Sequence, residues 1–565
     1  MADIFLKSIS IKGYKGFTDN TEITLSVPNG SVGSGLNIFV GENGTGKTSV
    51  LESISLLLVN NFTGQSKVSS SSFNNEENQD IEIIGKIDRP FDYEFPTPWK
   101  KTVQIKEIKV EVKGRARKTP GKLLSSQFQI SNVLEPTNRN PDWMKDGISD
   151  FYLNYESDRM PSDTGINIFF FGKDRIKQSK DGWGTSFSRV MEDFNWRFLS
   201  KANQEEVLNK WKGFYSTFSN FSGFGEKIKE TIIKKFEIGF FQNLSLELIE
   251  LKEPFSKAFF ALTGKNNLSQ VPIENLGLGI DLLFSILFLK ELGNQSKGSI
   301  IYCIDEPELS LHPQWQKIFF EILKEEAENK QIFISTHSLH FIEPSLLTNL
   351  KKFDFKEKIN IYSIDKDTAS NQKLQNLLHL ENREIFFTKT VILTEGITEK
   401  RRLKLFTSSV ALDIFIVEGI GNLDNVKNLC SILNIKFKAI VDLDYIRKFP
   451  ELLPNLSEEE SEQLDEINIL NKLIEVNEEN EKVKKILVNQ KIRIRDKIDS
   501  CLIGKIFVKM QNEKEYAQKV NKKIHELKAE KIFVLSSGMI EDYLDKHGNA
   551  SSQEKSKELL EILTD

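Results

Sequence analysis

The sequence predicts an α/β protein of two domains, and three observations lead to that fold class. The chain has 565 residues, which is too many for a single hydrophobic core. Near its start, an apolar strand runs into a glycine-rich loop and then a helix, as in a phosphate-binding loop. Strands and helices alternate again from residue 391, at a spacing typical of a doubly wound parallel sheet.

The composition is that of an ordinary globular protein, with 39% hydrophobic and 28% charged residues. There are 76 Lys and Arg against 81 Asp and Glu, a net charge of −5, so any affinity for nucleic acid must come from local basic faces. The three cysteines lack C-x-x-C spacing, which excludes a disulfide framework and a thiolate zinc site. Without a signal-peptide core or a membrane-spanning apolar run, we expect a cytoplasmic protein.

The first elements are predicted strands. Residues 4–12 and 22–26 alternate apolar and polar side chains, as a half-buried hairpin does. Residues 36–40, LNIFV, are all apolar and predict a buried strand ahead of the glycine-rich loop. Strand alternation returns at 81–88 and 103–112.

The middle of the chain has one region without a chemical motif and one dense in motifs. Residues from about 140 to 240 are rich in aromatic side chains and predict a mostly helical insertion, to which we assign dimerisation. Residues 271–342 hold a glycine pair, a long apolar helix, the strand SIIYCI, a helix from Pro313 and the strand QIFIS.

The second alternation has predicted strands at 391–394, 413–417 and 437–444, with helices between them. Residues 450–530 are rich in Lys and Glu and predict a helical insertion, and 531–535 supply a last strand. The predicted domain bounds are residues 1–385 for the first domain and 386–565 for the second.

The loop GENGTGKT at 41–48 fits the phosphate-loop pattern G-x-x-x-x-G-K-[ST]. Its glycines let backbone amides close around phosphates, and the helix N-terminus adds a favourable dipole. We expect Lys47 to reach the β- and γ-phosphate oxygens and Thr48 to offer its hydroxyl to Mg²⁺. The predicted ATP-binding residues here are Gly41, Asn43, Gly44, Gly46, Lys47 and Thr48.

A partner motif follows at IIYCIDEPELSLHP. Four apolar residues deliver Asp305 to the end of a strand, where it is expected to hold the Mg²⁺ shell. Glu306 follows, positioned to polarise the attacking water. The next strand ends in STHS, which puts His337 where a contact to the γ-phosphate is expected.

The order of these motifs resembles the ABC-type ATPases, especially the soluble SMC/RecF-like branch. In such proteins a signature loop from a second subunit closes on the γ-phosphate, so the resemblance implies a homodimer or higher homo-oligomer with ATP between two heads. The matching stretch contains Gly277 and Gly279. Gly277 stands where that family usually has serine, so backbone amides and a helix dipole are expected to cap the phosphate instead.

Residues 392–406, ILTEGITEKRRLKLF, pose a separate question. The turn has one glycine and two acids, whereas a phosphate loop needs several glycines and a lysine, so we interpret it as a metal site. Glu395 ends a predicted strand, and Glu399 lies one helical turn later on the same side.

Two more acids follow in the strand KAIVDLD. Asp442 and Asp444 are two residues apart, and in an extended chain this spacing points both carboxylates to one face. Four acids at the carboxyl edge of a parallel sheet lie where doubly wound folds bind ligands. Because such acids repel each other, Mg²⁺ is the natural occupant.

This arrangement resembles the Toprim domain, with an E-G turn after the first strand and D-x-D after the third. An ABC-type head followed by a Toprim domain is similar to the OLD (overcoming lysogenization defect) family of nucleases. TEGITEK and VEGIGN match that family's first two strand ends. SSGMIEDYL resembles its late strand–glycine–glutamate element, which implies that Glu541 is a further ligand.

The resemblance implies two Mg²⁺ or Mn²⁺ ions about a phosphodiester, beside one ion bound with ATP. It implies an ATP-regulated DNA endonuclease, of a kind that serves bacterial anti-phage defence with an operon partner such as a helicase or a reverse transcriptase with its noncoding DNA. The core metal ligands would be Glu395, Asp442 and Asp444, with Glu399 and Glu541 flanking them, and the catalytic set adds Glu306 in the head.

Other interpretations stay open. The chain could be an ATP-driven DNA-binding or sensor module with a non-catalytic Toprim platform, although a retired site has no reason to keep repelling acids. A topoisomerase or primase is a third option, but no strand-passage or zinc-bearing primase module is recognisable. The basic residues 400–404, KRRLK, either hold DNA or form a solvated face. Lys546 lies either near the scissile phosphate or on the surface.

Overall fold

The computed structural model describes the following residues: 4–57, 81–94, 102–114, 128–136, 152–154, 166–172, 230, 234–235, 244–247, 259–263, 270–272, 278–293, 299–407, 413–453, 458–476, 481–536 and 538–564. Most of the predicted insertion at 140–240 lies outside these residues, as does Gly277. The backbone of Asp444 is described, but its side chain is not.

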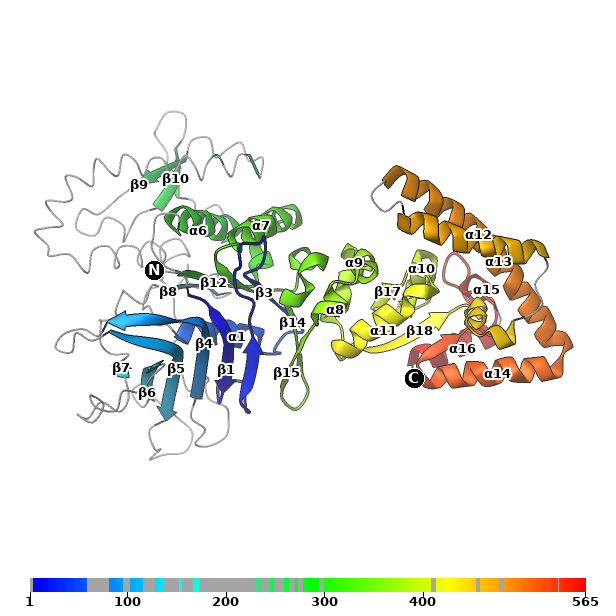
Figure 1. Cartoon of the computed structure of the whole chain (residues 1–565), viewed down its shortest axis with the longest axis horizontal. Coiled ribbons are helices and arrows are strands. Elements are labelled where there is room, and N and C mark those ends of the chain that lie inside the picture. The colour runs from blue at the N-terminus through cyan, green and yellow to red at the C-terminus, as the bar shows by residue number, and fades with distance from the viewer. Residues whose placement is uncertain are drawn as a thin grey trace, which may run out of the picture. The chain divides into compact units, whose positions relative to one another are not determined.

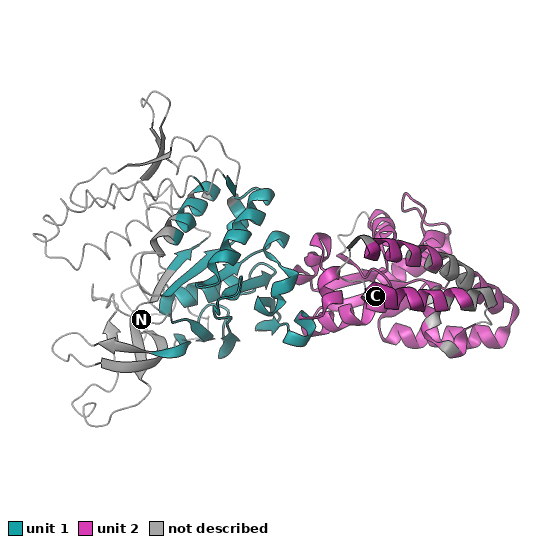
Figure 2. Cartoon of the chain, turned by 45° about the horizontal axis from the view of Figure 1, so that its top comes forward, with its two compact units in different colours: residues 1–369 teal, residues 370–565 magenta. Residues whose placement is uncertain are grey.

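The chain divides into two compact units, residues 1–369 and 370–565 (Figure 2). The division falls before the predicted boundary at 385 because the intervening segment is bonded to the second unit. The side chain of Asn382 donates to the Ile416 carbonyl at 2.8 Å and accepts from the Ile416 amide at 3.0 Å. The buried side chain of Asn382 thus bonds to the last residue of a strand in the second unit, so a segment that the sequence assigned to the first domain is attached to the sheet of the second.

Unit 1 is built on a six-stranded sheet in the order β15-β14-β3-β13-β12-β8 (Figure 1). All neighbouring pairs in it are parallel except β14 with β15. Its central strands are fully buried apolar runs, as parallel strands covered on both faces must be. The strands are β3 (Leu36–Gly41), β8 (Ile166–Phe171), β12 (Ser299–Asp305), β13 (Gln331–Ser335), β14 (Leu350–Phe355) and β15 (Ile359–Ser363).

A second, antiparallel sheet of unit 1 has the order β2-β1-β4-β5-β6-β7, and its first pair is the predicted hairpin. Helix α1 (Lys47–Leu57) lies between the two sheets, because its buried side chains join residues of both in one hydrophobic core. The strands are β1 (Leu6–Lys12), β2 (Thr21–Thr24), β4 (Ile81–Glu94), β5 (Thr102–Gly114), β6 (Phe128–Pro136) and β7 (Tyr152–Asn154).

The remaining described elements of unit 1 are a small sheet in the order β11-β10-β9 and several helices. The sheet comprises β9 (Leu244–Glu247), β10 (Phe259–Thr263) and β11 (Gln270–Pro272). The helices are α6 (Leu278–Gly293), α7 (Pro313–Glu326), α8 (Lys366–Ala369), and the 3-10 turns η5 (Pro307–Ser310), η6 (Leu339–Phe341) and η7 (Pro344–Asn349).

Within the region at 140–240 that the sequence predicts to be mostly helical, residues 166–171 form strand β8, while most of that prediction falls outside the described residues. The run INIFFF pairs with β12 in parallel over six residues, so it belongs to the nucleotide-binding sheet. A short, wholly apolar run fits a buried strand or a buried helix equally well, and only its pairing partner decides between them.

Unit 2 is built on a four-stranded parallel sheet in the order β17-β16-β18-β19 (Figure 1). The first strand along the chain therefore lies between the second and the third. The reversal of strand order between β16 and β18 is the switch point at which doubly wound sheets bind ligands. The strands are β16 (Thr390–Thr394), β17 (Ile414–Ile416), β18 (Lys436–Val441) and β19 (Ile532–Val534).

Helices cover this sheet. Side chains of α10, α15 and α16 share one hydrophobic core with the strands, while α11 packs against β18 and α14 against β19. The predicted insertion at 450–530 contains the long helices α12, α13 and α14. The helical elements of unit 2 are α9 (Gln372–Leu377), η8 (Leu380–Phe387), α10 (Ile397–Phe406), η9 (Ile420–Asn422), α11 (Leu423–Ile432), η10 (Leu443–Lys448), η11 (Pro450–Leu452), α12 (Glu458–Val476), α13 (Glu481–Asn512), α14 (Lys514–Ala529), α15 (Ile540–Tyr543) and α16 (Gln553–Thr564).

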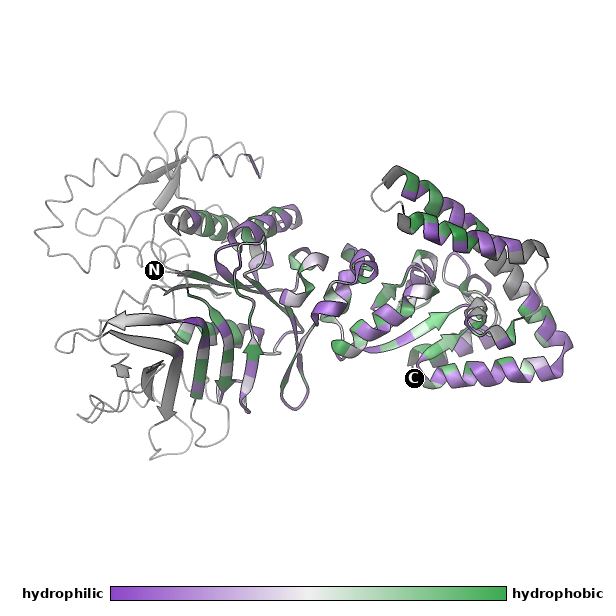
Figure 3. Ribbon diagram, in the orientation of Figure 1, coloured by the Kyte–Doolittle hydropathy of each residue, from purple (hydrophilic) through white to green (hydrophobic). Residues whose placement is uncertain are grey.

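Hydropathy follows this architecture. The strands of the parallel sheets are mainly hydrophobic, whereas α12 and α13 alternate between hydrophobic and hydrophilic residues (Figure 3). Among the described helices, none combines the length and the apolar character needed to cross a bilayer.

Candidate functional site

The phosphate-binding loop joins β3 to α1, as predicted. Gly41, Gly44 and Gly46 have φ values of 131°, 78° and 99°, a region that residues with a side chain rarely adopt. A Cβ added at Gly41 would lie 2.2 Å from the Phe353 carbonyl oxygen of β14, so only glycine fits there. The loop is therefore fixed by backbone conformation, which leaves its amides available to a phosphate.

Lys47 is buried, and its ammonium donates to the carbonyl oxygens of Gly41 at 2.7 Å and Glu42 at 2.6 Å. These contacts hold the ammonium against the loop that would surround the phosphates. Asn43, the other predicted residue of the loop, is exposed. The structure thus has the lysine at the loop.

Asp305 lies at the end of β12, fully buried beside the loop. Both of its carboxylate oxygens accept from the Thr48 hydroxyl, at 3.0 and 3.1 Å, and the Ser335 hydroxyl donates to Oδ1. The predicted pair of magnesium-shell residues, Thr48 and Asp305, is therefore in contact across 257 positions of sequence. Two hydroxyl donors thus fix the orientation of this carboxylate.

Glu306 follows Asp305 in the left-handed conformation, with φ 46° and ψ 63°. Its amide donates to the Ser335 carbonyl at 2.9 Å, which fixes the turn beside the end of β13. A non-glycine residue held in this region is strained, and such strain collects at functional sites. The conformation turns the chain sharply away from β12 immediately after the predicted magnesium ligand.

Glu308 is a functional candidate that the sequence reasoning missed. It is mostly buried, and its carboxylate accepts from the Thr336 hydroxyl at 2.9 Å and from the His337 amide. Burial raises the pKa of this carboxyl, and the Glu306 carboxylate nearby acts in the same direction. Glu308 therefore ties the segment after Asp305 to the segment that carries His337.

Gln316 on α7 completes this connection. Its amide nitrogen donates to the Leu311 carbonyl at 2.8 Å, and its oxygen accepts from the Ser338 hydroxyl at 2.6 Å. The predicted helix start at Pro313 is present, with His312 as its N-cap accepting from Gln314. The signal that could have revealed Glu308 was its place between the Asp305–Glu306 pair and this cap.

The predicted signature stretch is only partly described. Gly279 lies in the first turn of α6 and is buried, while Gly277 lies outside the described residues. The contact that these glycines would make with the phosphate of a second subunit stays a prediction.

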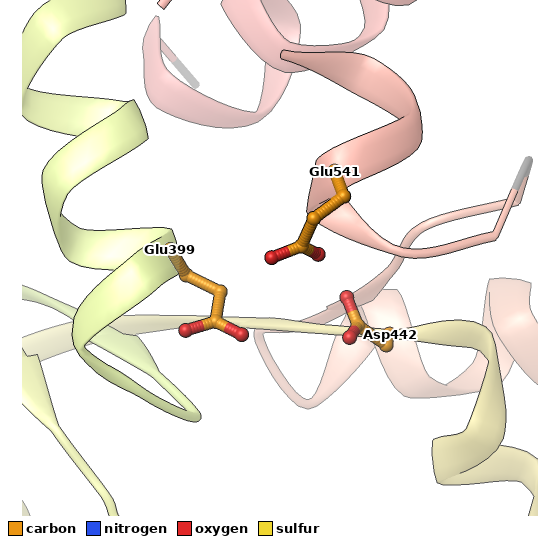
Figure 4. Close-up of side chains that lie close together, drawn as sticks. All are labelled: Glu399, Asp442 and Glu541. Atoms are coloured by element: carbon orange, nitrogen blue, oxygen red, sulfur yellow. The ribbon is translucent and has the colours of Figure 1, made fainter. Parts of the chain in front are cut away.

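Three carboxylates meet in unit 2. One oxygen each from Glu399, Asp442 and Glu541 lies within 4.8 Å of the other two, and Figure 4 shows the three groups turned toward one another. Glu399 comes from α10 after β16, Asp442 directly follows β18, and Glu541 comes from α15 after β19. The carboxyl ends of neighbouring parallel strands lie at the same edge of the sheet, so the residues that follow these strands, including positions 399, 442 and 541, can meet there.

Glu399 is the most constrained of the three. Its Oε2 is buried and has no hydrogen-bond partner among the described residues. Burial raises the pKa of its carboxyl, and the neighbouring Glu541 carboxylate raises it further. A Cβ added at Gly396 would lie 2.9 Å from this Oε2, so the glycine of the E-G turn makes room for the glutamate one helical turn on.

The backbone around Asp442 differs from the extended strand that the sequence predicted through Asp444. Strand β18 ends at Val441, and a 3-10 turn begins at Leu443, so the chain is not extended through Asp444. Asp442 Oδ1 accepts from the Ile540 amide at 3.1 Å, which links the end of β18 to the start of α15. The expected common face for Asp442 and Asp444 does not follow from this backbone, and the Asp444 side chain lies outside the described residues.

Glu395 directly follows the last residue of β16, Thr394, and its carbonyl accepts from the Gly419 amide at 3.3 Å. Its carboxylate is not one of the three that converge. The structure therefore brings together one residue of the expected core, Asp442, with the two expected to flank it, Glu399 and Glu541.

Helix α15 presents Glu541 through local hydrogen bonds. Asp542 Oδ2 accepts from the Met539 amide at 2.9 Å, which fixes the start of the helix. Gly538 precedes it with φ 124°, and a Cβ there would lie 2.3 Å from the same Asp542 oxygen. The turn thus requires Gly538 of the predicted late element and uses Asp542, the neighbour of the predicted ligand Glu541, to fix the helix start. Lys546, two residues beyond this element, is exposed.

The three carboxylates fit a divalent cation. The donor set consists of hard oxygen ligands of the kind that Mg²⁺ and Mn²⁺ take in proteins. A buried carboxylate oxygen without a hydrogen-bond partner costs free energy that a cation would offset. Asp442 and Glu399 are half-buried while Glu541 is exposed, so the cluster is open to solvent on one side.

The fold and these sites define a P-loop ATPase head joined to a Toprim domain, which confirms the α/β architecture expected from the sequence. A family model described as "AAA domain, putative AbiEii toxin, Type IV TA system" matches residues 36–343. Since this match covers more than half of the chain, the chain belongs to that family. A second model, "Overcoming lysogenization defect protein-like, TOPRIM domain", matches residues 386–444, which confirms the resemblance to the OLD family.

Three curated relatives align with this chain along much of their length. The OLD nuclease of Thermus scotoductus is 23% identical over 477 residues, covering 78% of this chain and 82% of the relative. Endonuclease GajA of Bacillus cereus is 22% identical over 556 residues, covering 79% and 77%. The Retron Vc95 probable ATPase of Vibrio cholerae is 23% identical over 401 residues, covering 63% and 73%.

Proposed function

We propose that the chain is an ATP-regulated, divalent-metal-dependent DNA endonuclease that acts in anti-phage defence. The observation that carries this proposal is the convergence of Glu399, Asp442 and Glu541 within 4.8 Å at the carboxyl edge of the second sheet. The Toprim match and the relatives named nuclease and endonuclease support cleavage of nucleic acid.

The acid cluster would hold the cation. Glu399, Asp442 and Glu541 would be its ligands, and we propose Glu395 and Asp444 as further ligands for a second ion. When bound, Mg²⁺ or Mn²⁺ supplies a Lewis acid and an activated water. The chain's own contribution is to fix the carboxylates: Gly396 admits Glu399, and Asp442 anchors the start of α15 through the Ile540 amide.

The head would regulate the cleavage through ATP. Lys47 would contact the phosphates, while Thr48 and Asp305 would hold the ATP-bound ion, consistent with their mutual contact. Glu306 would polarise the attacking water and His337 would contact the γ-phosphate. We propose that two heads close on ATP in a homodimer or larger homo-oligomer, with Gly277 and Gly279 of one head capping the nucleotide of the other.

The proposed partners are DNA and a protein encoded beside the chain. A relative named Retron Vc95 probable ATPase supports a reverse transcriptase with its noncoding DNA as that protein, and a helicase is the other candidate. Co-purification followed by identification of bound protein and nucleic acid distinguishes the two.

A plasmid-cleavage assay tests the proposed nuclease. The full chain is incubated with supercoiled DNA and Mg²⁺ or Mn²⁺, and the wild type is compared with Asp442→Ala and Asp413→Ala. Asp413 is an exposed acid that precedes β17, at the opposite, amino edge of the same sheet. We expect Asp442→Ala to abolish cleavage and Asp413→Ala to leave it intact. Lys47→Ala, assayed with and without ATP, reports whether ATP licenses or restrains cleavage.

The opposite outcome favours the other interpretation from the sequence. If neither metal supports cleavage of any DNA form, with or without ATP and the co-purified partner, the nuclease proposal fails. The chain would then be an ATP-driven DNA-binding or sensor module with a non-catalytic Toprim platform. Cleavage that persists in Asp442→Ala would locate the activity elsewhere, or in a contaminant.

A further inference from the structure

The basic residues at 400–404 on α10 have no role in the proposed function. The sequence left two roles open for them, contact with DNA or a solvated face. Lys400 takes neither role, because its side chain is only 4% exposed and its ammonium lies 3.3 Å from Glu381. Arg401, by contrast, is exposed.

Arg402 turns toward α15, the helix that carries Glu541. One guanidinium nitrogen, Nη1, donates to the Leu544 carbonyl and lies 3.5 Å from the Glu541 carbonyl. The other, Nη2, lies 3.9 Å from Glu541 Oε1. The side chain is 19% exposed, so water screens these contacts only in part.

Helix α15 has only four residues, Ile540–Tyr543, and so cannot hold its own position by internal hydrogen bonds. Its start is fixed by Asp442, which accepts from the Ile540 amide. At its end, Arg402 donates to the Leu544 carbonyl. Beside this contact, the Ser551 amide donates to the Tyr543 carbonyl at 2.8 Å. The forked guanidinium can satisfy a backbone carbonyl and face a carboxylate at once, which a lysine ammonium does less well.

The charge of Arg402 also acts on the cluster. It lowers the pKa of the Glu399 carboxyl, against the larger effect of burial, which raises it. One residue of α10 therefore tempers the repulsion between Glu399 and Glu541 while holding the helix on which Glu541 stands. Glu399 and Arg402 are three residues apart, so both face the same side of α10.

We propose that Arg402 is a positioning residue of the metal site, which holds α15 so that Glu541 reaches the cation, and that it is not a DNA contact. This inference rests on the proposed metal-dependent nuclease. Residues that orient metal ligands typically change metal affinity by about 10- to 100-fold when they are lost. We expect a loss in that range for Mn²⁺.

The test is titration of the full chain with Mn²⁺, without nucleotide, by calorimetry. Arg402→Ala should weaken Mn²⁺ binding by about 10- to 100-fold, and Arg402→Lys should weaken it less. Arg401→Ala is the matched control, since it removes the same charge from the adjacent position of α10 and should leave affinity unchanged. Thermal unfolding without metal checks that each variant folds. If Arg402→Ala does not fold, the Mn²⁺ affinity of Arg402→Lys is compared with that of the wild type instead.

A double substitution separates positioning from a general structural role. If Arg402 acts through Glu541, adding Arg402→Ala to Glu541→Gln should cause little further loss of Mn²⁺ affinity. Equal Mn²⁺ binding by Arg402→Ala and the wild type would overturn the inference. So would a fall in DNA affinity, measured in EDTA, without a fall in Mn²⁺ affinity. Absence of Mn²⁺ binding by the wild type would instead refute the proposed metal site itself.

Discussion

The two sites of this molecule treat their acidic groups in opposite ways. In the head, buried Asp305 accepts from the hydroxyls of Thr48 and Ser335, so its carboxylate oxygens have hydrogen-bond partners within the protein. In the Toprim unit, three carboxylates face one another, and Glu399 Oε2 is buried without a hydrogen-bond partner among the described residues. In the head the acid is held by hydroxyl donors, whereas in the Toprim unit the three acids lie against one another.

This difference predicts how each site responds to cations and to substitution. Removing an acid from the head leaves hydroxyl groups buried and unsatisfied, which lowers stability. Neutralising Glu399 relieves its repulsion with Glu541, which raises the stability of the metal-free protein while it removes a ligand. Stability and activity should therefore change together at Asp305 in the head and in opposite directions at Glu399 in the Toprim unit.

The largest effect is expected at Asp305. Asp305→Ala should lower ATP turnover by about 1,000-fold, because a metal contact is worth several kcal/mol and each 1.36 kcal/mol is tenfold in rate. It should also lower the melting temperature, because Thr48 and Ser335 lose their acceptor. Phosphate release and thermal unfolding measure the two effects, with the exposed acid Asp367→Ala as control. A stability equal to that of the wild type would break the comparison.

The second effect is stabilisation by metal without nucleotide. Mn²⁺ at 100 times its dissociation constant should stabilise the wild type by about 2.7 kcal/mol. Glu399→Gln should melt higher than the wild type in EDTA yet gain little from Mn²⁺, because it lacks both the repulsion and a ligand. Glu530→Gln, which alters an exposed acid, serves as the control. A wild type that Mn²⁺ does not stabilise would argue against an ion at the cluster.

A smaller effect is expected at Glu308. Glu308→Ala should reduce the kcat of ATP hydrolysis by about tenfold, since roughly 1.4 kcal/mol of hydrogen bonding to the His337 segment is lost. The KM for ATP should hardly change, because the phosphate loop is untouched, and Glu308→Gln should retain most activity. Steady-state kinetics measures this, with exposed Glu321→Ala on α7 as control. A rise in KM alone would assign Glu308 to nucleotide binding instead.

The smallest effect concerns pH. Burial raises the pKa of Glu308 above 4.5, so the folded state binds this proton more tightly than the unfolded state does. The resulting stability is fully present below the unfolded pKa and is lost as pH rises through the folded one. Glu308→Gln does not titrate, so its unfolding free energy relative to the wild type should increase from about pH 4 to about pH 7. Denaturant melts at several pH values measure it, and a constant difference would contradict the burial argument.

The sequence determined the parts whose chemistry is local. A phosphate loop needs its glycines, lysine and threonine at fixed spacing, so residues 41–48 could be assigned directly, and Asp305 followed from the apolar run before it. The E-G turn was equally local, since Gly396 and Glu399 lie one helical turn apart and the Glu399 carboxylate lies against Gly396. The two-domain α/β fold followed from the alternation of strands and helices.

The tertiary structure decided which of these residues meet. Strand order brings the ends of β16, β18 and β19 to one edge, so Glu399 and Asp442 are joined by Glu541 rather than by Glu395. Long-range contacts of this kind also place β8 in the nucleotide-binding sheet. They show that Arg402, which the sequence placed in a basic run, donates to the Leu544 carbonyl directly after α15. Spacing along a chain fixes what a turn can do, but the register and order of strands depend on packing between residues hundreds of positions apart.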